Sequence, residues 1–146
     1  MKTLLSTLVA LVAAAALAAG AGASADASVP TLTARSSSFG TVLFDGKGKV
    51  LYGFTRDTRG GKSRCYGACA AAWPVYYAKG KLKAGKGVKQ SSIGTTRRSD
   101  GRLQVTYNGW PLYYYINDGV GEIRCQNVDE FGGLWLVVKP SGALLR

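Results

Sequence analysis

Residues 40–57 read GTVLFDGKGKVLYGFTRD, and residues 101–118 read GRLQVTYNGWPLYYYIND. The two stretches align without a gap at an offset of 61 positions. Each copy has an apolar run, a glycine turn, a second apolar run and an aspartate, which is typical of a β-hairpin. The identical pairs are Gly40 with Gly101, Gly48 with Gly109, Leu51 with Leu112, Tyr52 with Tyr113, and Asp57 with Asp118. A repeated unit of this size cannot bury its apolar face alone, so we expect the two copies to pack together.

The rest of the chain adds strands, turns and one helix to this pattern. Asn108-Gly109 is a strong signal for a tight hairpin turn, and residues 134–138 (LWLVV) read as a buried strand. The alanine-rich residues 65–73 (CYGACAAAW) predict a short helix that Pro74 ends. The predicted fold is mainly β, an antiparallel barrel or sandwich built from two repeated hairpin units, with one short helix around the cysteines.

The N-terminal residues predict export. Lys2 precedes an apolar run, and Ala23-Ser24-Ala25 is a small-residue cleavage site, so residues 1–25 read as a signal peptide cleaved before Asp26. The apolar run is too short to span a bilayer, and no cysteine near the cleavage site can accept a lipid anchor. We therefore expect a secreted product, extracellular or associated with the cell wall, with no transmembrane segment after removal of the signal.

The exported part divides into two regions by composition. Residues 26–39 are small and polar and predict a flexible N-terminal segment. Residues 40–146 predict a single β-rich domain, with repeats at about 40–78 and 101–146 joined by a Lys/Gly-rich loop at 79–89. This loop reads as a solvated connection, and the alternative is a contact arm for an anionic surface.

Charge and composition limit the function. The chain carries a formal net charge of +11 and has no histidine, which removes the commonest general base and metal ligand. We therefore expect a protein that is not an enzyme. Its positive charge is explained by solubility alone, and the alternative is an anionic cell-wall polymer or a membrane surface as the partner; it has no motif for specific nucleic-acid recognition.

Two six-residue segments and a cysteine motif resemble a known family. Residues 52–57 (YGFTRD) and 113–118 (YYYIND) both fit Yx(F/W/Y)xxD, and the first copy continues into Cys65-x-x-x-Cys69-x-x-x-Trp73-Pro74. This combination resembles the bacterial secreted-repeat family, often labelled as predicted lipoproteins. The resemblance implies a tandem-repeat envelope protein, and it implies no particular activity or cofactor.

The motif has two physical interpretations. In a strand, Tyr52 and Phe54 point to one face, as do Tyr113 and Tyr115. The first interpretation is a folding element, in which these rings form the core and the carboxylates of Asp57 and Asp118 accept backbone N–H groups of the following turns. The second is an aromatic-lined groove for a sugar or a quinone-like ligand.

The three cysteines predict one disulfide and one free thiol outside the cytoplasm. Cys65 and Cys69 lie one helical turn apart, within bridging distance, and Cys125 is the alternative partner. We favour Cys65–Cys69, because both belong to the motif that carries the family resemblance. The functional alternative is a Cu(I) site or a redox pair at Cys65 and Cys69, with copper as the cofactor.

Three functions follow from these observations. We expect a non-catalytic binding or scaffold module of the envelope. The alternative is a small redox or Cu(I)-handling protein that uses the Cys65–Cys69 pair. A hydrolase ranks last, because it requires Asp57 and Asp118 to approach each other across the two repeats.

Overall fold

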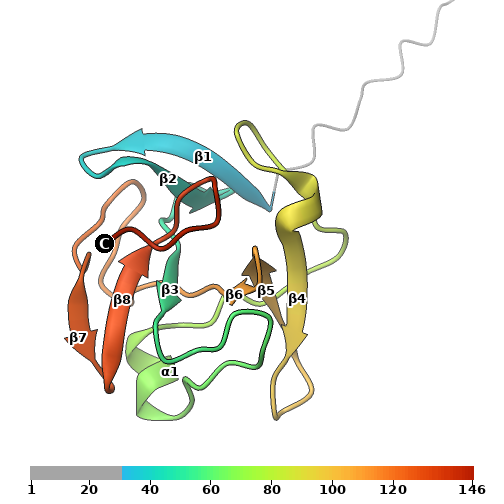
Figure 1. Cartoon of the computed structure of the whole chain (residues 1–146), viewed down its shortest axis with the longest axis vertical. Helices are drawn as coiled ribbons and strands as arrows, with labels where there is room; N and C mark the ends of the chain where they lie inside the picture. Colours follow the sequence, from blue (N-terminus) through green and yellow to red (C-terminus); the bar gives the residue numbers. More distant parts are fainter. Residues whose placement is uncertain (1–30) are drawn as a thin grey trace, which may run out of the picture.

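A computed structural model describes residues 31–146, and Figure 1 shows its elements. The predicted signal peptide and cleavage site lie outside the described residues. The helical elements are α1 (Ala68–Ala72) and the 3-10 turn η1 (Gln90–Ser92). The strands are β1 (Leu32–Ser37), β2 (Gly40–Asp45), β3 (Tyr52–Phe54), β4 (Ile93–Arg97), β5 (Leu103–Tyr107), β6 (Trp110–Pro111), β7 (Val128–Glu130) and β8 (Gly133–Val137).

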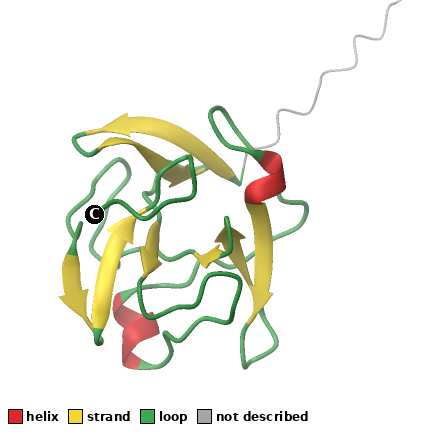
Figure 2. Ribbon diagram, viewed as in Figure 1, coloured by secondary structure: helices red, strands yellow, loops and turns green. Residues whose placement is uncertain are grey.

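The strands form three small antiparallel sheets, ordered β1-β2, β3-β8-β7 and β4-β5-β6 (Figure 2). The prediction of a mainly β antiparallel fold with one short helix is therefore confirmed. Within residues 31–146 the sheets do not close into a barrel. Isolated bridges connect them instead, and the central bridge pairs Tyr52 with Tyr113. In Figure 1, α1 lies at the opposite end of the molecule from the β1–β2 hairpin.

The first repeat begins earlier than the sequence predicted. Residues 26–39 were expected to be flexible, but β1 pairs with β2 along its whole length, from Leu32 opposite Asp45 to Ser37 opposite Gly40. Leu32 is fully buried, because it contributes to an apolar cluster with Leu43 and Leu51. The expectation of flexibility is therefore wrong for the β1 residues.

The two predicted hairpins form to different extents. Asn108 and Gly109 adopt positive φ values of 48° and 83° and turn β5 into β6, as predicted. In the first repeat the predicted hairpin has one isolated bridge, between Phe44 and Val50, and a hydrogen bond from the Leu51 amide to the Leu43 carbonyl at 3.0 Å. β2 pairs along its length with β1, and β3 pairs with β8, which places strands of both repeats in one sheet.

The Lys/Gly-rich segment 79–89 contains no strand or helix, and its backbone lies against β1. The amide of Ala34 donates to the carbonyl of Lys86 at 2.9 Å, and the amide of Gly85 donates to the carbonyl of Leu32 at 2.7 Å. The predicted loop is therefore present, and these hydrogen bonds fix its course over the first sheet. Between residues 31 and 146, the chain has no helix long and apolar enough to span a membrane.

Candidate functional site

The two repeats meet at an exchanged pair of tyrosine–aspartate hydrogen bonds. The backbones of Tyr52 and Tyr113 bond to each other in both directions, with N···O distances of 2.9 and 3.0 Å. The Tyr52 hydroxyl donates to Asp118 Oδ2 at 2.5 Å, and the Tyr113 hydroxyl donates to Asp57 Oδ2 at 2.7 Å. Each tyrosine thus binds the aspartate of the other repeat, and the two bonds are equivalent, as expected if a pseudo-two-fold axis relates the copies.

The second oxygen of each aspartate holds the turn that follows its strand. Asp57 Oδ1 accepts the amide of Arg64 at 2.7 Å, and Asp118 Oδ1 accepts the amide of Arg124 at 3.0 Å. Burial raises the pKa of both carboxyls, and the tyrosine hydrogen bonds oppose this rise. Each carboxylate thus accepts a backbone amide of the segment that follows its strand, which is the contact expected if the motif is a folding element.

Four aromatic rings lie in a row through the centre of the molecule, which we call the ring stack. Phe54, Trp135 and Trp73 are stacked in that order, and Tyr115 packs against Trp73 at an angle of 42°. The centroid distances along this stack are 4.1, 4.0 and 4.9 Å. Phe54 and Tyr115 occupy equivalent repeat positions, so the two ends of the stack are related by the pseudo-two-fold. The first three rings are fully buried, which supports the folding-element interpretation for them, whereas Tyr115 is half-buried.

The Tyr115 end of the stack opens into a groove of about 490 Å³. Its aromatic residues are Tyr76, Tyr77, Tyr114 and Tyr115, and its charged residues are Asp45, Lys47, Lys49, Lys79 and Lys81. Pro74 and Val75 also line it, because the chain leaves α1 and runs past this surface before it reaches the Lys/Gly-rich segment. We call this surface the lysine–tyrosine groove.

Both oxygens of Asp45, the carboxylate that lines the groove, accept hydrogen bonds from the protein itself. Asp45 Oδ1 accepts the amides of Lys47 and Lys49 at 2.9 Å each, and Asp45 Oδ2 accepts the Tyr114 hydroxyl at 2.8 Å. Burial raises the pKa of Tyr114, and the nearby Asp45 charge adds to this effect, so the phenol stays protonated as a donor. The ion pair between Arg124 and Glu122, the only one within residues 31–146, does not involve the groove. The four lysines therefore leave the groove strongly positive.

A comparison with protein-family models finds the same duplication. One model, described as a secreted repeat of unknown function, matches residues 33–76 and again residues 94–139. The chain belongs to this family. A search of curated proteins and a search of solved structures returned no match. The first match begins at Thr33 inside β1, which agrees with the structure and places the start of the repeat before the predicted residue 40.

The cysteines of this secreted repeat are arranged as the family motif indicated. Cys65 and Cys69 form a disulfide with a Cα–Cα distance of 5.3 Å, and Cys125 is free. Cys125 directly follows Arg124, just as Cys65 follows Arg64, so it is the counterpart of Cys65. A Cu(I) site at Cys65 and Cys69 requires the reduced pair and stays a prediction. No group of three or more potential metal-ligating Cys, Asp or Glu side chains forms within residues 31–146.

The disulfide should contribute modestly to stability, because it closes a loop of only a few residues. We expect the double variant Cys65→Ala/Cys69→Ala to remain folded and to lose about 2 kcal/mol in free energy of unfolding. Urea denaturation followed by circular dichroism measures this loss. Cys125→Ala is the matched control and should change stability by less than half as much, since it removes no crosslink. An unfolded double variant would contradict the expectation.

The sequence analysis did not single out three of the groove tyrosines, Tyr76, Tyr77 and Tyr114, as candidate site residues. Tyr76 and Tyr77 belong to neither copy of the six-residue motif, and Tyr114 occupies one of its variable positions. The comparison of repeats carries a signal for Tyr114, because its counterpart in the first copy is Gly53. A Cβ at Gly53 would lie 2.5 Å from Leu144 Cδ2, so Leu144 packs directly on Gly53 and leaves no room there for a side chain like that of Tyr114.

Proposed function

We propose that this secreted repeat is a non-catalytic binding module of the cell envelope, and that an anionic wall polymer binds in the lysine–tyrosine groove. The observation that carries the proposal is the combination of four lysines with four tyrosine side chains around one groove. Asp45, the acidic residue there, has both of its oxygens occupied by hydrogen bonds from the protein itself.

The structure of the repeat interface supports a non-catalytic role. A hydrolase needs an accessible nucleophile with a base, or two carboxylates that face the substrate. Asp57 and Asp118 are each only 5% exposed, and each holds a tyrosine hydroxyl and a backbone amide. These carboxylates therefore stabilise the contact between the repeats.

The chemistry of the groove favours a polymer that carries phosphates or carboxylates on a sugar or polyol backbone. Lysine ammonium groups attract such anions as point charges, and Lys47, Lys79 and Lys81 are exposed at the groove. The rings of Tyr76, Tyr77 and Tyr115 offer apolar surface for the backbone of the polymer. A concave surface suits an extended chain better than the flat headgroup plane of a membrane.

Removal of two groove lysines should weaken this binding strongly. We expect Lys79→Ala/Lys81→Ala to reduce affinity for poly(glycerol phosphate) by about tenfold, which corresponds to about 1.4 kcal/mol. Isothermal titration calorimetry at fixed salt measures the change. Both side chains are exposed in the Lys/Gly-rich segment, so thermal stability should stay the same.

The matched control is Lys62→Ala/Lys139→Ala, which removes the same charge from exposed positions outside the groove. It should change affinity by less than threefold, since screening weakens the interaction between distant exposed charges. Equal losses in both double variants would mean that binding follows net charge alone, and would contradict the proposal. Equal binding to anionic vesicles in both double variants, with no binding of the polymer, would point to a membrane surface.

A further inference from the structure

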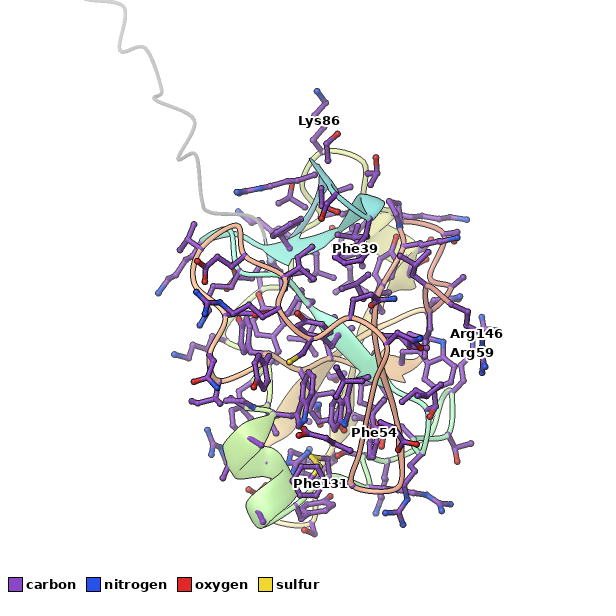
Figure 3. All side chains as sticks on the ribbon, turned by 90° about the vertical axis from the view of Figure 1, so that its left-hand side faces the viewer. Phe39, Phe54, Arg59, Lys86, Phe131 and Arg146 are labelled. Carbon is purple, nitrogen blue, oxygen red and sulfur yellow. A yellow bond between two sulfur atoms is a disulfide. The ribbon has the colours of Figure 1, made fainter. Side chains whose placement is uncertain are left out.

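The Phe54 end of the ring stack opens into a second cavity, also of about 490 Å³. Phe54 lines this cavity as its counterpart Tyr115 lines the groove, so one cavity lies at each end of the stack. The other principal side chains are Arg56 and Arg64, with Tyr66 and Phe131 as the aromatic surfaces. Figure 3 shows Phe54 and Phe131 close together near α1.

Phe131 is held in a conformation that its own side chain disfavours. Its φ is 54°, in the left-handed region where a bulky residue is a genuine outlier, and its side chain is 40% exposed. The turn between β7 and β8 would form more easily with glycine or asparagine at this position. Backbone strain of this kind is common at ligand-binding positions. Here the strained turn exposes the ring of Phe131 to solvent beside the cavity.

Neighbouring contacts fix the strained turn. Arg56 Nη1 donates to the Phe131 carbonyl at 2.9 Å. Gly133 allows the turn to pack closely, because a Cβ there would lie 2.9 Å from both Phe54 Cε2 and Arg56 Cγ. The guanidinium of Arg56 is thereby fixed at the cavity, and most of its five donors remain available for a ligand.

The charges around the cavity are positive. The Arg64 side chain is exposed, and its amide is the group that Asp57 accepts. Beneath the cavity, the buried Arg98 bonds to the neutral acceptors Ser63, Gln104 and the Cys65 carbonyl, and its guanidinium lies 4.2 Å from the Tyr66 ring centroid. Asp57 is the nearby carboxylate, and the amide of Arg64 and the hydroxyl of Tyr113 occupy its two oxygens.

We propose that this cavity is a second ligand site, which takes a phosphate or carboxylate attached to a ring. Arg56 and Arg64 bind the anion through the planar donor fork that suits such groups, and Phe131 and Tyr66 contact the ring. We call it the arginine–phenylalanine site. The site shares no residue with the lysine–tyrosine groove, so this proposal does not depend on whether the groove binds a polymer.

The test uses the secreted protein, labelled with ¹⁵N and purified from culture medium, with phenyl phosphate as the probe. We expect titration to shift the amide signals of Tyr66, Phe131 and Gly132, and Arg56→Gln or Arg64→Gln to weaken this response at least fivefold. The control Arg146→Gln removes an exposed charge at the C-terminus and should leave the response within twofold. Equal weakening by Arg146→Gln, or shifts confined to other residues, would overturn the proposal.

Phe131→Gly separates ligand binding from folding. Glycine adopts the same φ without strain, so this variant should melt at the same or a higher temperature. It should bind phenyl phosphate at least fivefold more weakly and inorganic phosphate as well as the parent protein does. Unchanged affinity for phenyl phosphate would overturn the role of the ring. The groove variant Lys79→Ala/Lys81→Ala should retain the response at Tyr66 and Phe131, which distinguishes failure of this site from failure of the groove.

Discussion

Replacement of Trp135 by alanine should lower the free energy of unfolding by about 3–5 kcal/mol, the range for deletion of a buried large aromatic side chain. Trp135 is fully buried and stacks between Phe54 and Trp73 at centroid distances of 4.1 and 4.0 Å. It also makes a T-shaped contact with the ring of Tyr113, at a centroid distance of 5.1 Å. Trp73 cannot move into the space without leaving the rings of Tyr52 and Tyr115, and Tyr113 cannot move there without losing its hydrogen bond to Asp57, so much of the cavity should persist.

Urea denaturation followed by circular dichroism measures this loss, and Trp110→Ala is the matched control. Trp110 is half-buried in the edge strand β6, so its replacement should cost less than half as much. The same residue type is removed in both variants, and only the environment differs. A loss at Trp135 no greater than that at Trp110 would mean that the stack does not hold the repeats together.

The exchanged hydrogen bonds should appear as energetic coupling between repeats. We expect Tyr113→Phe to lower the free energy of unfolding by about 2 kcal/mol, because it removes a buried hydrogen bond to the carboxylate of Asp57. In a double-mutant cycle with Asp57→Asn, we expect a coupling energy of about 1–2 kcal/mol, as found for groups in direct contact. Chemical denaturation of the two single variants and the double variant gives this value.

The control cycle pairs Tyr113→Phe with Asp118→Asn, the aspartate of its own repeat. Asp118 accepts the hydroxyl of Tyr52 instead, so this cycle should give a coupling below about 0.5 kcal/mol. Tyr115→Phe is a further control, because the hydroxyl of Tyr115 hydrogen-bonds to Asn117 and Cys125, and neither is a motif aspartate. Stronger coupling within a repeat than between repeats would contradict the exchanged arrangement.

Local features of the sequence predicted much of the fold. The Asn108-Gly109 turn, the short alanine-rich helix and the Cys65–Cys69 pair depend on neighbours in the chain, and all three are present. β1 was missed, because its small polar residues resemble a flexible segment. At the offset of 61 positions, Leu32, the first residue of β1, aligns with Ile93, the first residue of β4. Extending the alignment of the two repeats to these residues would have predicted β1.

The candidate sites were harder to predict, because they depend on contacts between distant segments. Tyr52 and Asp57 belong to one motif, yet each pairs with the other repeat, and nothing in a six-residue spacing indicates an exchange. The groove combines Lys47 from one turn with Tyr77 and Tyr114 from two other segments. Phe131 lies in the segment Glu130–Trp135, but its left-handed backbone becomes visible only in the folded turn.

The most direct test of the proposed function is to map poly(glycerol phosphate) onto the ¹⁵N-labelled secreted protein by nuclear magnetic resonance at moderate salt. If the lysine–tyrosine groove is the binding site, the largest shifts will fall on Lys47, Tyr76, Tyr77, Lys79 and Tyr114, and they will saturate with the affinity that calorimetry gives. Small shifts spread evenly over the exposed basic residues, or no shifts at the groove, would contradict the proposed function.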